Sequence, residues 1–242
     1  MFAHRGGCAL GPENTFVTFD RGIAAGADGL ELDVHLSADG ILVVHHDETL
    51  DRTTSGSGPI AARTAAELAR IDAGDAAGVP ALRDVLRRYA DVPLIVEMKV
   101  NSVAMGEALA REVHRAGAAD RVCAAGSGVR SLAAARAALP EMASSAAHAE
   151  VQIALYRSWV GWPARHAPYG GFQVPEVALG HRIVSPRFLR HAHQRGLKVQ
   201  VWTVDEEPDM RRLLSWGVDG LITNRPDVAV RVRNEAGSMA AR

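Results

Sequence analysis

The sequence predicts an α/β protein whose single domain is a (β/α)8 barrel. A chain of 242 residues with 48% apolar residues can bury the core of one barrel, and eight short apolar segments recur along it. Several of these segments are followed by a helical pattern, which indicates repeated units of strand and helix and a parallel sheet. We expect the barrel to occupy residues 1–232 and residues 233–242 to form a frayed tail.

The expected strands are short apolar segments, and the expected helices are the longer segments of helical pattern that follow them. The strands are 2–4, 29–34, 94–98, 122–125, 144–147, 171–174, 199–203 and 220–223. The clearest helices are 14–26, 81–89, 103–116, 129–139, 186–195 and 206–216. Two of these helical patterns stop at Gly26 and Gly196, because glycine is favoured where a helix ends.

A ninth strand-like segment, Ile41 to His46, does not continue the parallel pattern. Only residues 37–40 separate it from the second strand, whereas a parallel crossover needs about a dozen residues or more. The Asp39-Gly40 pair is typical of a hairpin turn, so we expect this segment to fold back and bring His46 near Asp33. Residues 47–80 then predict a long loop excursion with one short helix near 64–69.

Composition and charge exclude several classes of function. The net charge is -1 and the basic residues are scattered, so the basic stripe of a nucleic-acid-binding protein is missing. No stretch approaches about 18 consecutive apolar residues and no signal-peptide pattern is seen, so we expect a cytoplasmic protein without stable membrane insertion. Cys8 and Cys123 are too few for a disulfide framework and are expected to be reduced. The oligomeric state is not determined by the sequence.

Acidic residues are concentrated where the expected strands end, which is where barrels place reactive groups. Glu31 and Asp33 are two residues apart and therefore share one face of a strand. Two neighbouring buried carboxylates repel unless a cation neutralises them. With Glu97 from another strand, this oxygen-only set suits one divalent ion, Mg²⁺ or Ca²⁺. The alternative is a structural network in which Glu31 and Glu97 pair with Arg5 and Lys99.

Two histidines lie at strand ends that face the same rim. Imidazole is suited to proton transfer near neutral pH, so we expect His4 and His46 to form an acid/base pair. His45 points away from His46, whereas His35 shares the face of Asp33 and could line the rim. The remaining histidines are expected to be packed or exposed without a role: His114, His148, His166, His181, His191 and His193.

A series of motifs in a fixed order spans nearly the whole chain. They are His4-Arg5-Gly6, Pro12-Glu13-Asn14-Thr15, Glu31-Leu32-Asp33-Val34, His46-Asp47, Leu50-Asp51-Arg52-Thr53-Thr54, Val79-Pro80-Ala81-Leu82, Glu97-Met98-Lys99, Trp202-Thr203-Val204, Gly217-Val218-Asp219-Gly220 and Thr223-Asn224-Arg225-Pro226-Asp227. In types and order, these motifs resemble those of the glycerophosphodiester phosphodiesterase family.

The resemblance implies metal-dependent hydrolysis of a small-molecule phosphodiester to glycerol 3-phosphate and an alcohol. It also implies roles for individual residues, and these agree with the interpretation given above. The resemblance implies that the metal ligands are Glu31, Asp33 and Glu97 and that the catalytic pair is His4 and His46. It implies that Arg5 and Lys99 contact the phosphate, and that Trp202 lines the pocket for the alcohol part of the substrate.

Two segments depart from the family pattern and leave the pocket wall open to question. Residues 124–128 have small side chains where the family has a Ser-Phe step, and residues 144–148 lack the bulky apolar residues of a strand. Three other functions also stay open: a lysophospholipase D, whose substrates carry an acyl chain; a non-catalytic barrel that binds phosphodiesters or a partner protein; and a metal-dependent enolising barrel. The motifs do not determine whether the metal is Mg²⁺ or Ca²⁺, or whether the nucleophile is water or a hydroxyl of the substrate. They also do not determine which histidine is the acid and which is the base.

Overall fold

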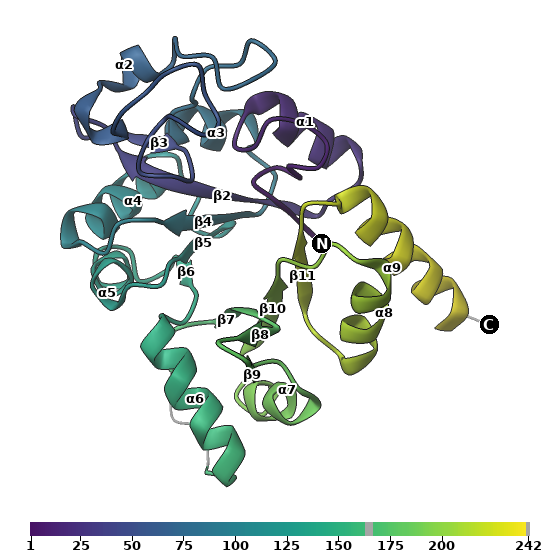
Figure 1. Cartoon of the computed structure of the whole chain (residues 1–242). Helices are drawn as coiled ribbons and strands as arrows, with labels where there is room; N and C mark the ends of the chain where they lie inside the picture. Colours follow the sequence, from purple (N-terminus) through teal and green to yellow (C-terminus); the bar gives the residue numbers. More distant parts are fainter. Residues whose placement is uncertain (163–166, 241–242) are drawn as a thin grey trace.

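The computed structural model describes residues 1–162 and 167–240 and contains the predicted barrel (Figure 1). Eight parallel strands follow the order β6-β5-β4-β2-β1-β11-β10-β7. A parallel bridge between Ser145 and Gly171 joins the two ends of this series, so the barrel is nearly closed. The predicted (β/α)8 class is therefore confirmed.

The barrel strands lie close to the segments predicted from apolar pattern. They are β1 (Phe2–His4), β2 (Gly29–Leu36), β4 (Leu94–Met98), β5 (Val122–Ala125), β6 (Ala143–Ser144), β7 (Gly171–Pro175), β10 (Lys198–Trp202) and β11 (Gly220–Thr223). The largest difference is β6, which was expected to continue to Ala147. It is shorter because Ala147 already serves as the N-cap of the next helix.

Helices follow the strands and pack outside the barrel. They are α1 (Phe16–Ala24), α3 (Leu82–Arg88), α4 (Val103–Arg115), α5 (Val129–Ala138), α6 (His148–Val160), α7 (Pro186–His193), α8 (Glu207–Trp216) and α9 (Pro226–Ala240). Thr15 caps α1, since its side chain accepts a hydrogen bond from the Thr18 amide. α9 runs through much of the expected frayed tail, which is helical as far as Ala240.

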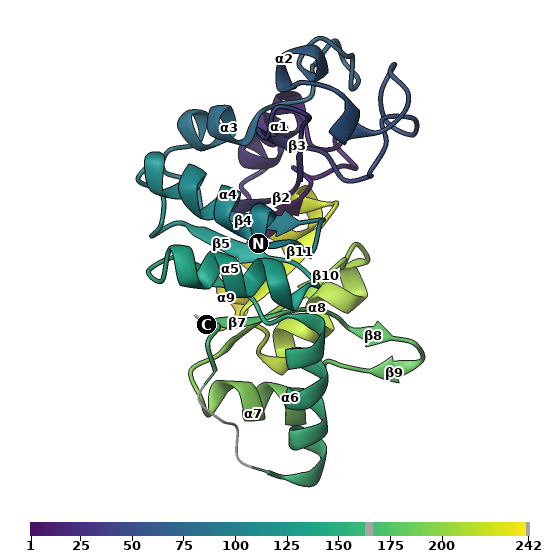
Figure 2. The same ribbon diagram turned by 90° about the vertical axis from the view of Figure 1, so that its left-hand side faces the viewer.

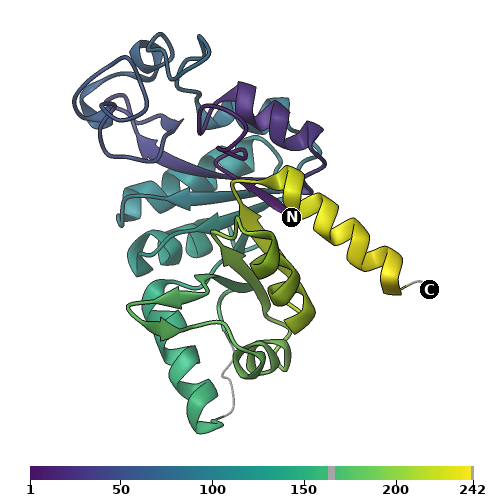
Figure 3. The ribbon, with the colours of Figure 1, turned by 45° about the vertical axis from the view of Figure 1, so that its right-hand side comes forward.

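The segment after β2 forms the expected hairpin. β3 (Leu42–Val44) is antiparallel to β2, with Val44 opposite Val34. The loop that follows carries η1 (Ile60–Ala62) and α2 (Ala65–Leu68), the latter held by a capping box. Figures 2 and 3 show this excursion at one side of the barrel, while α6, α7 and a small hairpin lie at the opposite side. The hairpin is β8 (Val177–Ala178) with β9 (His181–Arg182) and was not predicted.

Side chains alternate between the two faces of β2, so the apolar residues of this strand face the core and the acidic residues face the site. Leu30, Leu32 and Val34 are fully buried in the apolar cluster shared with the surrounding helices. Glu31 and Asp33 lie on the other face, towards the barrel axis, as a period of two requires. Within the described residues, no helix is long and apolar enough to cross a membrane.

The contact between α4 and α5 gives a prediction about stability. A Cβ added at Gly106 would lie 2.2 Å from the Ser131 carbonyl oxygen, so the two helices would have to separate. We expect Gly106→Ala to lower the free energy of unfolding by about 1–3 kcal/mol, the usual cost of overpacking, although alanine favours a helix. Denaturant unfolding measures this change.

A matched control is Gly237→Ala in α9, where an added Cβ meets nothing within 4 Å. Only the helix preference for alanine applies there, so this variant should gain stability, by at most about 1 kcal/mol. Equal effects of the two substitutions would show that the close contact at Gly106 is unimportant.

Candidate active site

The carboxyl ends of the barrel strands surround a pocket of about 550 Å³. This is the end at which barrel enzymes hold their reactive groups. All site residues predicted from the sequence line this pocket, except Asp33, which lies beneath it. Those at the pocket wall are His4, Arg5, Glu31, His46, Glu97, Lys99 and Trp202.

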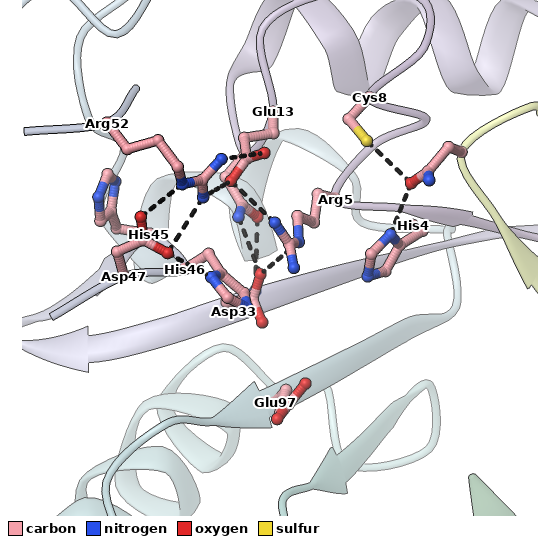
Figure 4. A network of polar contacts seen from close by, with 12 residues as sticks. His4, Arg5, Cys8, Glu13, Asp33, His45, His46, Asp47, Arg52 and Glu97 are labelled. Atoms are coloured by element: carbon pink, nitrogen blue, oxygen red, sulfur yellow. Dashed lines mark hydrogen bonds and ion pairs between the residues drawn. The ribbon is translucent and has the colours of Figure 1, made fainter. Parts of the chain in front are cut away.

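Strand register brings the three carboxylates together. Asp33 of β2 is paired with Glu97 of β4, and Glu31 lies two residues before Asp33 on the same face. One oxygen from each carboxylate lies within 4.8 Å of the others. Figure 4 shows Glu97 on the neighbouring strand, opposite Asp33. Burial, and then repulsion from Asp33 and Glu97, raise the pKa of Glu31 well above its usual value.

Two cationic side chains offset part of this negative charge. Lys99 Nζ lies 3.3 Å from both Asp33 Oδ1 and Glu97 Oε1. Burial lowers the pKa of Lys99, but these two carboxylates outweigh that effect and raise it. Arg5 Nε is 3.4 Å from Asp33 Oδ2, yet the same guanidinium also contacts Glu13 at 3.0 Å. Glu13 is also paired with Arg52, so Arg5 and Lys99 are left to balance Glu31, Asp33 and Glu97, and these three carboxylates outnumber the two cations by one.

The donor set fits a hard divalent cation. Asp33 Oδ1 is buried and, within the described residues, has its contact with Lys99 but no well-directed hydrogen bond. Buried oxygens normally have a partner, so an atom without one marks a place for a ligand. Together with the excess negative charge and the absence of sulfur from this cluster, this fits Mg²⁺ or Ca²⁺ held by Glu31, Asp33 and Glu97.

The turn after β1 aims a backbone donor at this cluster. Arg5 and Gly6 have φ values of 51° and 88°, in the left-handed region. This conformation lets the Arg5 amide donate to Glu31 Oε2 at 3.0 Å. A side chain at Gly6 would lie 2.6 Å from Phe19 Cδ1, so both the backbone conformation and the packing require glycine.

His4 is oriented by a chain of hydrogen bonds from the loops that follow β11 and β10, and Figure 4 shows the contact at its ring. The Asn224 amide nitrogen donates to Asp205 Oδ2 at 2.7 Å, which leaves Asn224 Oδ1 facing His4 Nδ1 at 2.6 Å. An oxygen at that position requires a proton on Nδ1, so Nε2 is the free acceptor, 3.8 Å from Glu31. Burial lowers the pKa of His4 and favours this neutral tautomer, although the Asn224 bond opposes the shift.

His46 is held by a second network. Its Nδ1 lies 2.6 Å from Asp47 Oδ1, and Arg52 bridges Asp47 to Glu13 through several hydrogen bonds. The Arg52 guanidinium holds the pKa of Asp47 well below its usual range. The backbone oxygen of His46 is 3.0 Å from the ring of His35, so His35 supports the loop beneath the rim.

Several residues of the site were not predicted from the sequence. Asn224 and Asp205 orient His4 from loops outside the pocket lining; Asn224 lies within a family motif, whereas Asp205 lies in none of those quoted. His148 and His181, for which no role was expected, line the pocket. They reach it from α6 and from the unpredicted β8–β9 hairpin, so no local pattern marked them. His166 lies outside the described residues.

Comparison with known proteins identifies the family. The sequence model of the glycerophosphoryl diester phosphodiesterase family matches residues 4–228. The chain belongs to this family. It is therefore a phosphoric diester hydrolase, as its motifs indicated.

Curated relatives and solved structures agree with this assignment. A glycerophosphodiester phosphodiesterase of Caldanaerobacter subterraneus subsp. tengcongensis is 31% identical over 251 residues, covering 98% of both chains. One of Bacillus altitudinis is 32% identical, covering 97% of this chain and 98% of its own. The crystal structure of the enzyme from Agrobacterium tumefaciens matches with a TM-score of 0.80 and 27% identity, covering 96% and 98% of the two chains. An Oleispira antarctica phosphodiesterase, solved with its product sn-glycerol-3-phosphate, shares the fold with a TM-score of 0.79, 24% identity and 96% coverage of each chain.

The crowding of carboxylates gives a prediction about the metal-free protein. Glu31→Gln removes one of three close negative charges and keeps an oxygen that can accept from the Arg5 amide. We expect this variant to melt at a higher temperature than wild type in the presence of a chelator, because the repulsion is relieved. Thermal unfolding with excess EDTA measures the change.

Glu107→Gln is the matched control, since Glu107 is an exposed residue of α4 with one surface partner, Arg111. Its melting temperature should stay close to that of wild type. A lower melting temperature for Glu31→Gln would mean that the cationic neighbours already balance the site without a metal.

Proposed function

We propose that this protein hydrolyses glycerophosphodiesters to glycerol 3-phosphate and an alcohol, with one Mg²⁺ or Ca²⁺ bound by Glu31, Asp33 and Glu97. The observation that carries the proposal is the convergence of these carboxylates with two histidines and two cationic side chains at one end of the pocket. The structure of the Oleispira antarctica phosphodiesterase was solved with its product sn-glycerol-3-phosphate, which supports glycerol 3-phosphate as the product proposed here.

The charged side chains would bind and orient the phosphate. Arg5 and Lys99 line the pocket beside the carboxylates, so a phosphate there meets two positive groups already fixed by ion pairs. A bound divalent cation would polarise a phosphoryl oxygen and offset the charge of the transition state. Trp202 is 43% exposed at the pocket wall, where it would contact the alcohol part of the substrate.

The two histidines would divide the proton transfers. His4 presents an unprotonated Nε2 to the pocket because Asn224 holds the proton on Nδ1, so we assign it as the base that activates the nucleophile. The Nδ1 atom of His46 is held by the Asp47 carboxylate, so we assign His46 as the acid that protonates the leaving alkoxide.

A metal-dependent assay of glycerol 3-phosphate release tests the reaction. With glycerophosphocholine as substrate, we expect activity to be lost in excess chelator and restored by adding back Mg²⁺ or Ca²⁺. Glu97→Gln should weaken the response to added metal. Full activity after exhaustive chelation, verified by elemental analysis, would exclude the metal-dependent mechanism.

The histidine roles give a separate prediction. His4→Ala and His46→Ala should each lower kcat/KM by roughly 10²-fold or more, the usual effect of losing a positioned acid or base. With an aryl phosphodiester, whose leaving group departs without protonation, the loss should shrink for His46→Ala but not for His4→Ala.

His114→Ala is the control, because this histidine is exposed on α4, away from the pocket lining. Its kcat/KM should match wild type. Equal losses for His4→Ala and His46→Ala on both substrates would contradict the assignment of His46 as the acid.

A further inference from the structure

The pocket continues well beyond the residues that would act on the phosphate. One end holds His4, His46 and the charged cluster. The other end is bordered by α6 and by the β8–β9 hairpin, neither of which contributes a carboxylate to the cavity. A glycerophosphodiester with a small alcohol needs only the first end, so the second end is available to another part of a larger substrate.

A passage with small side chains connects the two ends. Ala125 is paired with Glu97 in the sheet, so the passage begins beside the carboxylate cluster. Gly126 and Ser127 follow at the pocket wall, and Ala146, two residues after the end of β6, lines the same cavity. The backbone of Ser127 accepts a hydrogen bond of 3.1 Å from the His148 amide, which ties the passage to the start of α6.

Beyond this passage the wall is mainly apolar. Val151, Leu155 and Trp159 lie at spacings of four residues along α6, so they line one face of the helix. Ala178, Leu179 and Ile183 line the cavity from the hairpin side.

The polar groups of this part of the cavity are His148 and Gln152 at the start of α6 and His181 of the hairpin. His148 and Gln152 hydrogen bond to each other at 3.0 Å. The helix rises about 12 Å from Val151 to Trp159. The apolar part is therefore deep enough to cover several methylene groups rather than a single methyl.

Apolar side chains at the outer end remain in contact with water. Trp159 is 50% exposed and Leu179 is 92% exposed, although both line the cavity. Exposed apolar surface continuous with a binding site is typical of a ligand-binding groove. A polar head group at this end would leave these side chains in water, whereas an alkyl chain would cover them.

We infer that the outer half of the pocket binds an acyl chain, so that the protein hydrolyses phosphodiesters bearing one such chain, lysophospholipids among them. This inference rests on the proposed function, because the same residues would cleave the same bond. The nucleophile's oxygen bonds to phosphorus as the bond from phosphorus to the leaving alcohol breaks. His4 takes a proton from the nucleophile, His46 gives one to the alkoxide, and the acyl ester is untouched.

The test compares substrates that differ only in the acyl chain, below the concentration at which they aggregate. Glycerophosphocholine has no chain, and short-chain lysophosphatidylcholines carry one on the glycerol half. Glycerophospho-N-acylethanolamines carry it on the leaving alcohol, so the two series show which half enters the groove. In at least one series we expect kcat/KM to rise about threefold to tenfold for every two methylene groups.

Two variants should weaken this dependence on chain length. Trp159→Gln removes the outermost apolar contact, and Ser127→Phe fills the passage. Ile153→Gln is the matched control on the same helix: Ile153 is 58% exposed, close to the 50% of Trp159, but does not line the cavity. The control should keep the full dependence.

The possible failures are distinguishable. If glycerophosphocholine is hydrolysed as fast as every acylated substrate, the acyl groove is wrong and the proposed function stands. A preference seen only above the aggregation concentration, and lost equally in Ile153→Gln, would instead indicate docking to a lipid surface and would overturn the groove. No release from any substrate with metal present would overturn the proposed function itself.

Discussion

The burial of two carboxylates side by side on one strand is the constraint on which the rest of the site depends. Glu31 and Asp33 are 4% and 1% exposed, and they share one face of β2 with Glu97 opposite. Buried charges are stable only when paired, hydrogen bonded or bound to a cation. The surrounding loops are arranged to meet that requirement: Arg5 comes from the turn after β1, and Lys99 from the end of β4.

The same requirement explains why polar residues far apart in the chain contact one another. The Asn14 amide donates to Asp33 at 3.0 Å from the loop before α1, and Glu13 beside it contacts Arg52 of the excursion. Arg52 in turn fixes Asp47, next to His46. Neutralising the centre of the barrel therefore also positions the rim, because Arg5 contacts both Asp33 and Glu13, and Glu13 in turn pairs with Arg52.

The apolar half of the pocket follows a different physical principle. Its shape depends on side-chain size: small residues end β5 and β6, and large apolar ones line α6 and the hairpin. A charged centre and an apolar groove within one cavity match a ligand with a charged head and an apolar tail. The polar end of the cavity would fix the position of the phosphate. Burial of apolar area would strengthen binding of the tail without fixing how far the tail slides along the groove, because the hydrophobic effect is not directional.

The sequence by itself determined the barrel, the hairpin after β2 and the set of polar residues at the strand ends. Those features depend on short-range patterns, such as the period of two that placed Glu31 and Asp33 on one face. Only the tertiary structure decided the pocket wall and the partner of His4. Asn224 is 220 residues from His4, and α6 meets the β8–β9 hairpin across the cavity. Such contacts depend on how distant segments pack when the barrel closes, and no local periodicity encodes them.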